Sequence, residues 1–133
     1  MNTLDRTLAL SASGMQAQAS RLRHVAENIA NADTPGYRRK TIPFRPDVLP
    51  GDAFGEASGV VAGRVQLSQR ELTRIYDPGH ILADETGHYD GSNVDLMVEI
   101  ADAREAQRSY EANLRMFDQA RQMSQSLIGL LRR

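Results

Sequence analysis

The last third of the chain carries a helical pattern that is too long for a compact protein of 133 residues. A continuous helix over residues 93–133 would reach about 60 Å at ~1.5 Å per residue, whereas a compact chain of this size has a radius of gyration of about 14 Å. One face of this helix consists of Ala103, Ala106, Tyr110, Asn113, Phe117, Ala120, Ser124, Leu127 and Leu131. A second row consists of Ala112, Met116, Met123 and Leu130, with Leu114 and Ile128 on the other flank. Because one partner helix covers only one such face, we expect the rest to be buried between subunits.

A second helical pattern opens the chain. Its apolar or small residues alternate in steps of four and three, which is a heptad seam: Leu8, Ala12, Met15, Ala19, Leu22, Ala26 and Ile29. Asn2 or Thr3 is expected to cap its start, with Asp5 in the first turn, and Thr34 before Pro35 to close its end. The alanines on one side of the seam would let a second helix approach closely.

The two patterns are separated by a region of β and turn signals. Residues 42–44 and 61–67 alternate apolar with polar or small side chains, and residues 72–76 form a further short β candidate. Turn clusters lie at Pro50-Gly51-Asp52, Asp77-Pro78-Gly79 and Asp90-Gly91. The long C-terminal helix is expected to begin near Ser92 or Asn93, with Asp95 near its positive end.

These patterns predict a mainly α fold with a small irregular β-containing middle insert. We assign residues 1–34 to the N-terminal helix, residues 35–91 to the turn and the small β-containing middle region, and residues 92–133 to the long C-terminal helix. The two helical segments are expected to form one helical core.

Composition and charge exclude several classes of function. The chain has no Cys, which removes disulfides, thiolate catalysis and Cys-based metal sites, and only 5% aromatic residues, which makes a self-contained enzyme core thin. Residues 1–46 carry seven Lys/Arg against three Asp/Glu, and residues 47–92 carry three against eight. This split disfavours a nucleic-acid platform and favours complementary patches that join like subunits head to tail. The only early apolar run, residues 8–10, predicts neither a signal peptide nor a spanning helix.

The first helix ends in an abrupt turn at residues 28–37, Asn-Ile-Ala-Asn-Ala-Asp-Thr-Pro-Gly-Tyr. Asn28 and Asn31 lie where amide side chains satisfy free backbone groups, and residues 33–36 turn the chain sharply. An ordinary helix–turn boundary explains this chemistry equally well.

This segment resembles the N-terminal signature of the bacterial flagellar rod and hook family, Asn-(Leu/Ile/Met)-Ala-Asn-x-x-Thr-x-Gly-Tyr. Residues 76–84, 93–95 and 108–113 resemble segments of a proximal-rod member of that family. Ser92 and Ile81 stand where relatives usually carry proline, a departure that concerns only local loop geometry. The residues that carry the resemblance are Asn28, Asn31, Asp33, Thr34, Pro35, Gly36, Tyr37, Asn93, Val94, Asp95, Ser109, Tyr110, Ala112 and Asn113.

The resemblance implies a structural subunit of the flagellar basal-body rod, located in the periplasmic space and exported without a cleavable signal peptide. Its terminal helices would form a coiled-coil-like inner layer of a hollow drive shaft that transmits torque toward the hook, and the asparagine-rich corner would fix where the chain leaves that layer. The implied partners are further copies of itself, rod subunits of the FlgB, FlgF and FliE types, and the flagellar type III export apparatus. Nucleic acid, direct membrane insertion and cofactors are not expected.

We predict the subunit interface from the two helical seams. Its residues are Leu8, Ala12, Met15, Ala19, Leu22, Ala26, Ile29, Tyr110, Phe117, Leu127 and Leu131. A Phe117→Ala substitution is expected to cost about 3–5 kcal/mol per subunit if the ring is fully buried.

Other residues suggest weaker alternatives. The chain offers a possible metal-ligand set, which consists of His80, Asp84, His88 and Asp90. It would support a metal-binding protein or enzyme, but solvated surface is the simpler interpretation, and we assign no catalytic, cofactor-binding or metal-binding residue. A FlgB-like rod paralogue and a two-helix adaptor remain as further alternatives.

Three charged features carry structural expectations. His24 is expected at the surface or in an interface, and residues 38–40, which are three cations, are expected to face an acidic neighbouring subunit. Glu99 lies four residues from Asp95 and five from Arg104, so solvated or intersubunit contacts are expected for it rather than acid–base catalysis.

Overall fold

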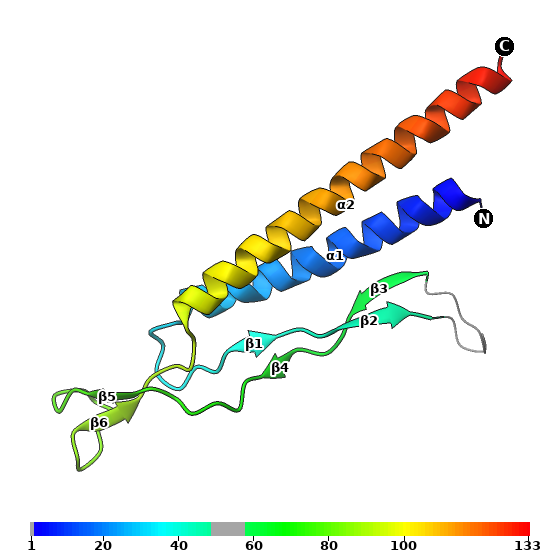
Figure 1. The fold of residues 1–133 in the computed structure, drawn as a ribbon. Coiled ribbons are helices and arrows are strands. Elements are labelled where there is room, and N and C mark those ends of the chain that lie inside the picture. Colours follow the sequence, from blue (N-terminus) through cyan, green and yellow to red (C-terminus); the bar gives the residue numbers. More distant parts are fainter. Residues whose placement is uncertain (1, 49–57) are drawn as a thin grey trace.

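The computed structural model describes residues 2–48 and 58–133, and two helices dominate it. Helix α1 spans Thr3–Ala30 and helix α2 spans Leu96–Leu131. The helices are antiparallel, lie close together where α1 ends and α2 begins, and diverge toward the two termini, which lie at the same end of the molecule (Figure 1). The predicted arrangement of two long helices flanking a small β-containing region is confirmed.

Helix α1 begins as predicted but ends earlier. The Asn2 side chain accepts a hydrogen bond from the Asp5 N–H at 2.7 Å, which satisfies one of the free donors of the first turn. At the other end, the Asn31 side chain and its backbone N–H both donate to the Glu27 carbonyl. This local cap ends the helix at residue 30, so the expectation that Thr34 closes it is wrong.

Helix α2 begins later than predicted. Its N-cap is Asp95, whose carboxylate accepts from the Met97 N–H at 3.0 Å, and not Ser92 or Asn93. The Asn93 side chain is unavailable for capping because it accepts from the Arg39 N–H at 2.7 Å. A long-range contact therefore moves the start of the helix by about one turn.

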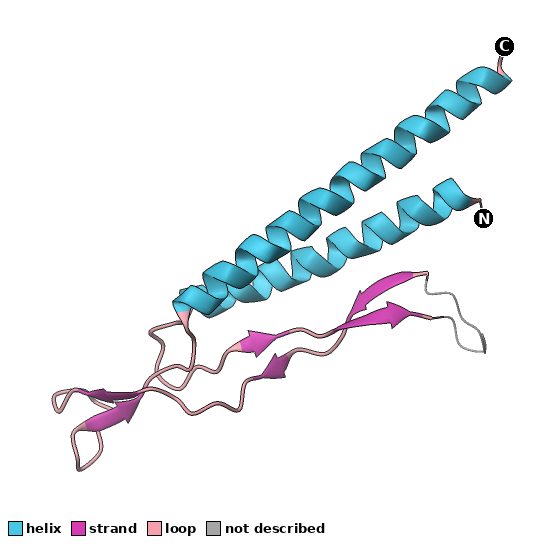
Figure 2. Ribbon diagram, viewed as in Figure 1, coloured by secondary structure: helices cyan, strands magenta, loops and turns pink. Residues whose placement is uncertain are grey.

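The middle region contains a long antiparallel ribbon that runs beside α1 (Figure 2). It is made of four short strands: β1 (Lys40–Thr41) pairs with β4 (Gln66–Leu67), and β2 (Phe44–Asp47) pairs with β3 (Gly59–Ala62). Between these two pairs the returning segment holds one residue more than the outgoing one, which interrupts the ladder beside Pro43. Residues 61–67, predicted as one alternating segment, are therefore divided between two strands. The predicted turn at residues 50–52 lies outside the described residues.

A short hairpin projects from the end of the ribbon that carries β1 and β4 (Figure 1). It pairs β5 (Arg74–Tyr76) with β6 (His88–Asp90) in antiparallel register. Strand β5 confirms part of the β candidate at residues 72–76. Strand β6 was not predicted, because a three-residue strand of polar and aromatic side chains lacks the alternation that marks a strand.

The apolar core is thin, as the low aromatic content predicts. Its buried members are Ala17, Val25, Ile42, Ala106 and Ala120. A comparable set of polar side chains is buried with them: Ser11, His24, Asn28, Ser92, Asn93 and Glu99. His24 is therefore not a surface residue of the single chain. Among the described residues, no helix is long and apolar enough to cross a membrane.

Candidate assembly interface and its polar corner

The predicted seam of α1 lies beside the line along which this helix packs within the chain. The buried positions of α1 are Ser11, Ala17, His24, Val25 and Asn28. The predicted seam residues are only half-buried, such as Leu8, Met15 and Leu22, or exposed, such as Ala26 and Ile29. Their assignment to a subunit interface stays a prediction.

Small residues explain why the buried line differs from the seam. A Cβ atom added at Gly14 would lie 2.8 Å from the Asn113 Nδ2 atom of α2, which is closer than van der Waals contact allows. At this position the absence of a side chain on α1 allows close contact with α2, and the larger seam residues remain on the flank.

The predicted seam of α2 is divided between a covered part and an open part. Ala106 and Ala120 are buried, and Tyr110 and Phe117 between them are half-buried. Beyond residue 124 the seam is exposed, as Leu131 at 87% exposure illustrates. Because the helices diverge, this last part of α2 has no partner in the described part of the chain (Figure 1).

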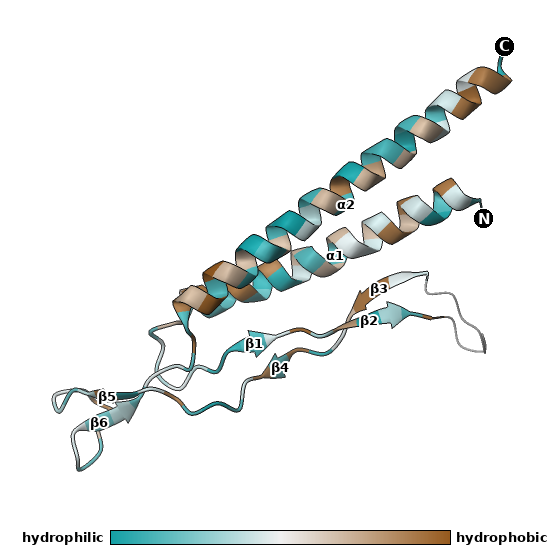
Figure 3. Cartoon of the chain, in the orientation of Figure 1, coloured by the Kyte–Doolittle hydropathy of each residue, from teal (hydrophilic) through white to brown (hydrophobic). Residues whose placement is uncertain are grey.

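The outward faces of α2 carry further exposed apolar side chains. They are Leu96, Met97, Val98, Ile100, Leu114, Met116, Met123, Ile128 and Leu130. Apolar residues gather at both ends of α2, and the last turns form an apolar tip (Figure 3). Exposed apolar side chains that gather on a helix mark an interaction site, and those of the last turns adjoin the open part of the seam.

The opposite end of the helix pair is held by polar contacts, which we call the polar corner: Asn28, Tyr37, Arg39, Lys40, Asn93, Glu99 and Asp102. Asn28 is its fully buried centre. The Asn28 Oδ1 atom accepts from the Lys40 N–H and from the Tyr37 hydroxyl, each at 2.9 Å. Its Nδ2 atom donates to the Lys40 carbonyl at 2.8 Å and to Glu99 Oε2 at 3.2 Å. One side chain thus satisfies both backbone groups of a strand residue, as a neighbouring strand would.

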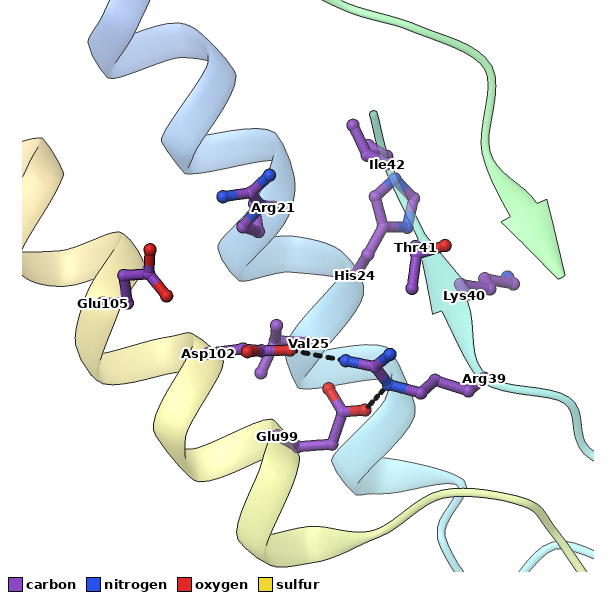
Figure 4. A pocket seen from close by; sticks show the side chains of 10 residues that line it. All are labelled: Arg21, His24, Val25, Arg39, Lys40, Thr41, Ile42, Glu99, Asp102 and Glu105. Carbon is purple, nitrogen blue, oxygen red and sulfur yellow. Dashed lines mark hydrogen bonds and ion pairs between the residues drawn. The ribbon is translucent and has the colours of Figure 1, made fainter. Parts of the chain in front are cut away.

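A buried carboxylate joins the corner to α2. The Glu99 side chain is fully buried and pairs with the Arg39 guanidinium, which also pairs with Asp102 one turn further along the helix (Figure 4). The Arg39 guanidinium compensates the buried charge of Glu99, which would be costly without a partner in this position. The pairing fixes β1 against α2 as well as against α1.

The cations at residues 38–40 are therefore not a free patch. Arg38 donates to the Ser68 and Arg70 carbonyls. Lys40 pairs with Glu27 at 3.0 Å, which lowers the pKa of the Glu27 carboxyl and raises that of the lysine. All three have partners within the chain, and the expectation that they also face an acidic neighbouring subunit stays a prediction.

Residues far apart in the resemblance motif meet at this corner. Asn93 Oδ1 accepts from the Arg39 N–H at 2.7 Å, and its Nδ2 atom donates to the Ser68 and Arg70 carbonyls. Burial raises the pKa of Tyr37, whose hydroxyl donates to Asn28. Gly36 adopts a positive φ of 76° in the turn, a conformation that favours glycine.

Other motif residues lie elsewhere. Asn31 and Thr34 belong to the turn that caps α1, and Asp95 caps α2. Ser109, Tyr110, Ala112 and Asn113 lie well along α2, away from the corner.

Sequence reasoning missed the contribution of Glu99, Arg39 and Asp102. The expectation of solvated or intersubunit contacts for Glu99 is wrong, since this side chain has no exposed surface. The usable signal was the spacing of Glu99 and Asp102, which places two carboxylates on one helix face where a single guanidinium can bridge them.

A cavity of about 280 Å³ lies beside the corner, between α1, α2 and β1 (Figure 4). The His24 Nδ1 atom is buried and has no hydrogen-bond partner within the described part of the chain, although it lies 3.5 Å from Glu27 Oε2. The cavity walls also carry the charged side chains of the corner, so it belongs to the same structural unit.

The side chains of the possible metal-ligand set make contacts with other protein groups. Asp84 accepts from the Thr86 hydroxyl at 2.6 Å and pairs with Arg74, and these contacts hold the pKa of the Asp84 carboxyl well below its usual range. The His80 ring stacks on the Tyr89 ring with centroids 3.9 Å apart. Across residues 2–48 and 58–133, no three His, Asp or Glu side chains are grouped to hold a metal ion.

Comparisons with known proteins agree with both helical ends of the chain. The family described as "Flagella basal body rod protein" matches residues 8–38, and that described as "Flagellar basal body rod FlgEFG protein C-terminal" matches residues 85–130. The first match contains the turn that ends α1, and the second contains all of α2 except its last residue.

Individual relatives extend the match to nearly the whole chain. The flagellar basal-body rod protein FlgC of Agrobacterium fabrum is 40% identical over 99% of this chain and 98% of its own length. FlgC of Salmonella typhimurium is 36% identical over 86% and 87%, and FlgC of Borreliella burgdorferi is 28% identical over 94% and 95%. The chain belongs to the FlgC family of flagellar basal-body rod proteins.

Proposed function

We propose that this protein is a structural subunit of the proximal rod of the bacterial flagellum and that it works only as part of an assembly. The observation that carries the proposal is the exposed apolar surface of α2 beyond residue 124, which has no partner within residues 2–48 and 58–133. Because the chain belongs to the FlgC family of rod proteins, we assign the partners of this surface to a flagellar rod.

The mechanism we propose is mechanical. In the assembly, α1 and α2 pack against helices of neighbouring subunits in a coiled-coil-like inner layer around a hollow centre, and the β-containing middle faces outward. Sliding one subunit past another would expose apolar seams and break many contacts at once, so torque passes along the shaft toward the hook. The polar corner keeps the ribbon at a fixed position on the helix pair.

The wider setting follows from the same proposal. The partners are further copies of this chain and rod subunits of the FlgB, FlgF and FliE types, and the protein reaches the periplasmic space through the flagellar type III export apparatus. We assign it a role in flagellum-dependent motility without catalysis or cofactors.

The test combines sedimentation with far-UV circular dichroism of the purified chain over a range of concentrations. We expect helicity to rise as the chain assembles, because the open helix ends gain partners only then. A Leu127→Ser, Leu131→Ser double variant should not assemble at concentrations where the native chain does.

The matched control changes exposed polar residues of the same helix, Gln119→Ser with Gln122→Ser, and should assemble normally. A native chain that is a fully helical monomer at every concentration, alone and with other rod subunits, would contradict the proposal and would favour a two-helix adaptor.

A further inference from the structure

The tip of the β5–β6 hairpin exposes an apolar pair. Ile81 is 95% exposed and Leu82 is 59% exposed, and Tyr76 at the base of the loop is 67% exposed. Single exposed apolar residues are common on protein surfaces. Two adjacent aliphatic side chains at the end of a projecting hairpin form a small knob, which stands away from both helices (Figure 1).

The knob is held in a defined conformation. The Asp84 carboxylate accepts from the backbone N–H groups of Thr86 and His88, at 2.9 and 3.1 Å, and pairs with Arg74 at 2.6 Å. Backbone hydrogen bonds within residues 77–87 and the His80–Tyr89 stack close the loop further. Because the loop is ordered beforehand, binding through it loses little conformational entropy.

A groove on the first turns of α2 has a matching character. Its apolar floor is Met97, Ile100 and Ala101, of which Met97 is 76% exposed, and its volume is about 490 Å³. Arg104 and Arg108 continue the same helix face, since the spacing of these positions is that of successive turns. Glu105 also borders the groove.

The charges beside the knob and the groove are complementary. Asp77 and Glu85 flank the knob, are exposed, and have no side-chain partner within the described residues. Arg104 and Arg108 at the groove likewise lack an ion-pair partner in the described part of the chain. The groove therefore offers two free cations against one carboxylate, and the knob offers two free carboxylates.

We propose that the hairpin tip of one copy of this chain docks in the α2 groove of a second copy, with Ile81 and Leu82 on the apolar floor and the carboxylates of Asp77 and Glu85 beside Arg104 and Arg108. The β5–β6 hairpin extends away from α2 of its own chain (Figure 1), so we assign the contact to two different molecules. Knob and groove are different surfaces, and such head-to-tail contacts build open helical assemblies. This inference rests on the proposed self-assembly of the chain.

The first test is a disulfide cross-link between two single-cysteine variants, because the native chain has no Cys. Ile81→Cys protein mixed with Ala101→Cys protein should give a heterodimer under mild oxidation. The matched control mixes Ile81→Cys with Ala112→Cys, an exposed alanine of the same helix outside the groove. We expect at least about tenfold more heterodimer from the groove pair than from the control pair. This ratio is the one that a tenfold higher affinity of the hairpin tip for the groove would give. Equal yields would overturn the inference.

The second test reverses charges. Arg104→Glu with Arg108→Glu should weaken association about tenfold or more in sedimentation, and mixing this variant with Asp77→Lys, Glu85→Lys protein should restore it. If the native chain assembles but neither the cross-link nor the rescue is seen, the inference fails alone. If the native chain does not assemble under any condition, the proposed function fails with it.

Discussion

At the scale of single residues, Asn28 shows how one amide side chain connects three segments. It satisfies both backbone groups of Lys40 and contacts Glu99 from a position with no exposed surface. Removing such a group would leave buried donors and acceptors without partners, each at a cost of about 1–3 kcal/mol. An amide is required here because the site calls for a donor and an acceptor at once.

The Asn28→Asp variant tests that requirement. The new carboxylate still accepts from the Lys40 N–H and the Tyr37 hydroxyl. Its second oxygen replaces the amide nitrogen, which lies 3.2 Å from Glu99 Oε2, and so brings a second negative charge next to Glu99. Like charges raise the pKa of one of the pair, so destabilisation grows as pH rises through the carboxyl range. We expect a loss of about 2–4 kcal/mol in unfolding free energy at pH 7, and less at pH 4, from urea denaturation. Asn2→Asp, which keeps a good cap, is the control.

The Glu99→Ala variant tests the buried ion pair. The Arg39 guanidinium would keep its ion pair with Asp102 but lose its fully buried partner. The Asn28 Nδ2 atom would lose one of its acceptors. We expect the unfolding free energy to fall by about 3 kcal/mol. Glu111→Ala, at an exposed position of the same helix, should change it by no more than ~0.5 kcal/mol. Similar losses for both variants would mean that the pair does not hold the corner.

The pH dependence of the β5–β6 hairpin follows from Asp84. Hydrogen bonds from Thr86 and the Arg74 guanidinium lower its pKa in the folded hairpin below the ordinary value of 3.8. A group whose folded pKa is lowered stabilises above its unfolded pKa and loses that effect as pH falls through the folded pKa. Hydrogen exchange should therefore show the His88 N–H protected above about pH 4 and progressively less protected below it. Asp84→Asn should abolish this transition.

At the scale of elements, the approach of α1 and α2 depends on Gly14. Alanine in a helix interior is favoured over glycine by about 1 kcal/mol, but here its Cβ would lie 2.8–2.9 Å from three side-chain atoms of Asn113. We expect Gly14→Ala to lower the unfolding free energy by about 1–2 kcal/mol. Adding Asn113→Ala should recover part of that loss in a double-mutant cycle.

Gly129 provides the matched control for this prediction. It lies in α2, and a Cβ there would meet no atom within 4 Å. Gly129→Ala should therefore raise the stability of the isolated chain by about 0.5–1 kcal/mol. A stabilising Gly14→Ala would mean that the helices separate readily at that point.

At the scale of the whole molecule, the single chain buries few large side chains. Phe117 illustrates this because its ring is only half-buried in the single chain. We expect Phe117→Ala to cost about 1–2 kcal/mol in the isolated chain and about 3–5 kcal/mol per subunit in an assembly that buries the ring fully. Thermal unfolding of monomer and assembly measures both values, and equal losses would place Phe117 outside the subunit interface.

The sequence by itself determined the two helices, a cap at Asn2 or Thr3 and the β character of the middle, because each depends on local periodicity or on a side chain within a few residues. It also indicated that α2 has more apolar surface than one helix covers. Strand β6 escaped prediction because three residues carry too little pattern.

Only the tertiary structure decided which charges are buried and where α2 begins. Asn28 and Glu99 are 71 residues apart, and Arg39 lies 60 residues from Glu99, so no local pattern joins them. The packing line of α1 likewise depends on Gly14, whose small size matters only when Asn113 of α2 lies against it. Periodicity gives the faces of a helix, but the face that is buried is chosen by the partner that fits most closely.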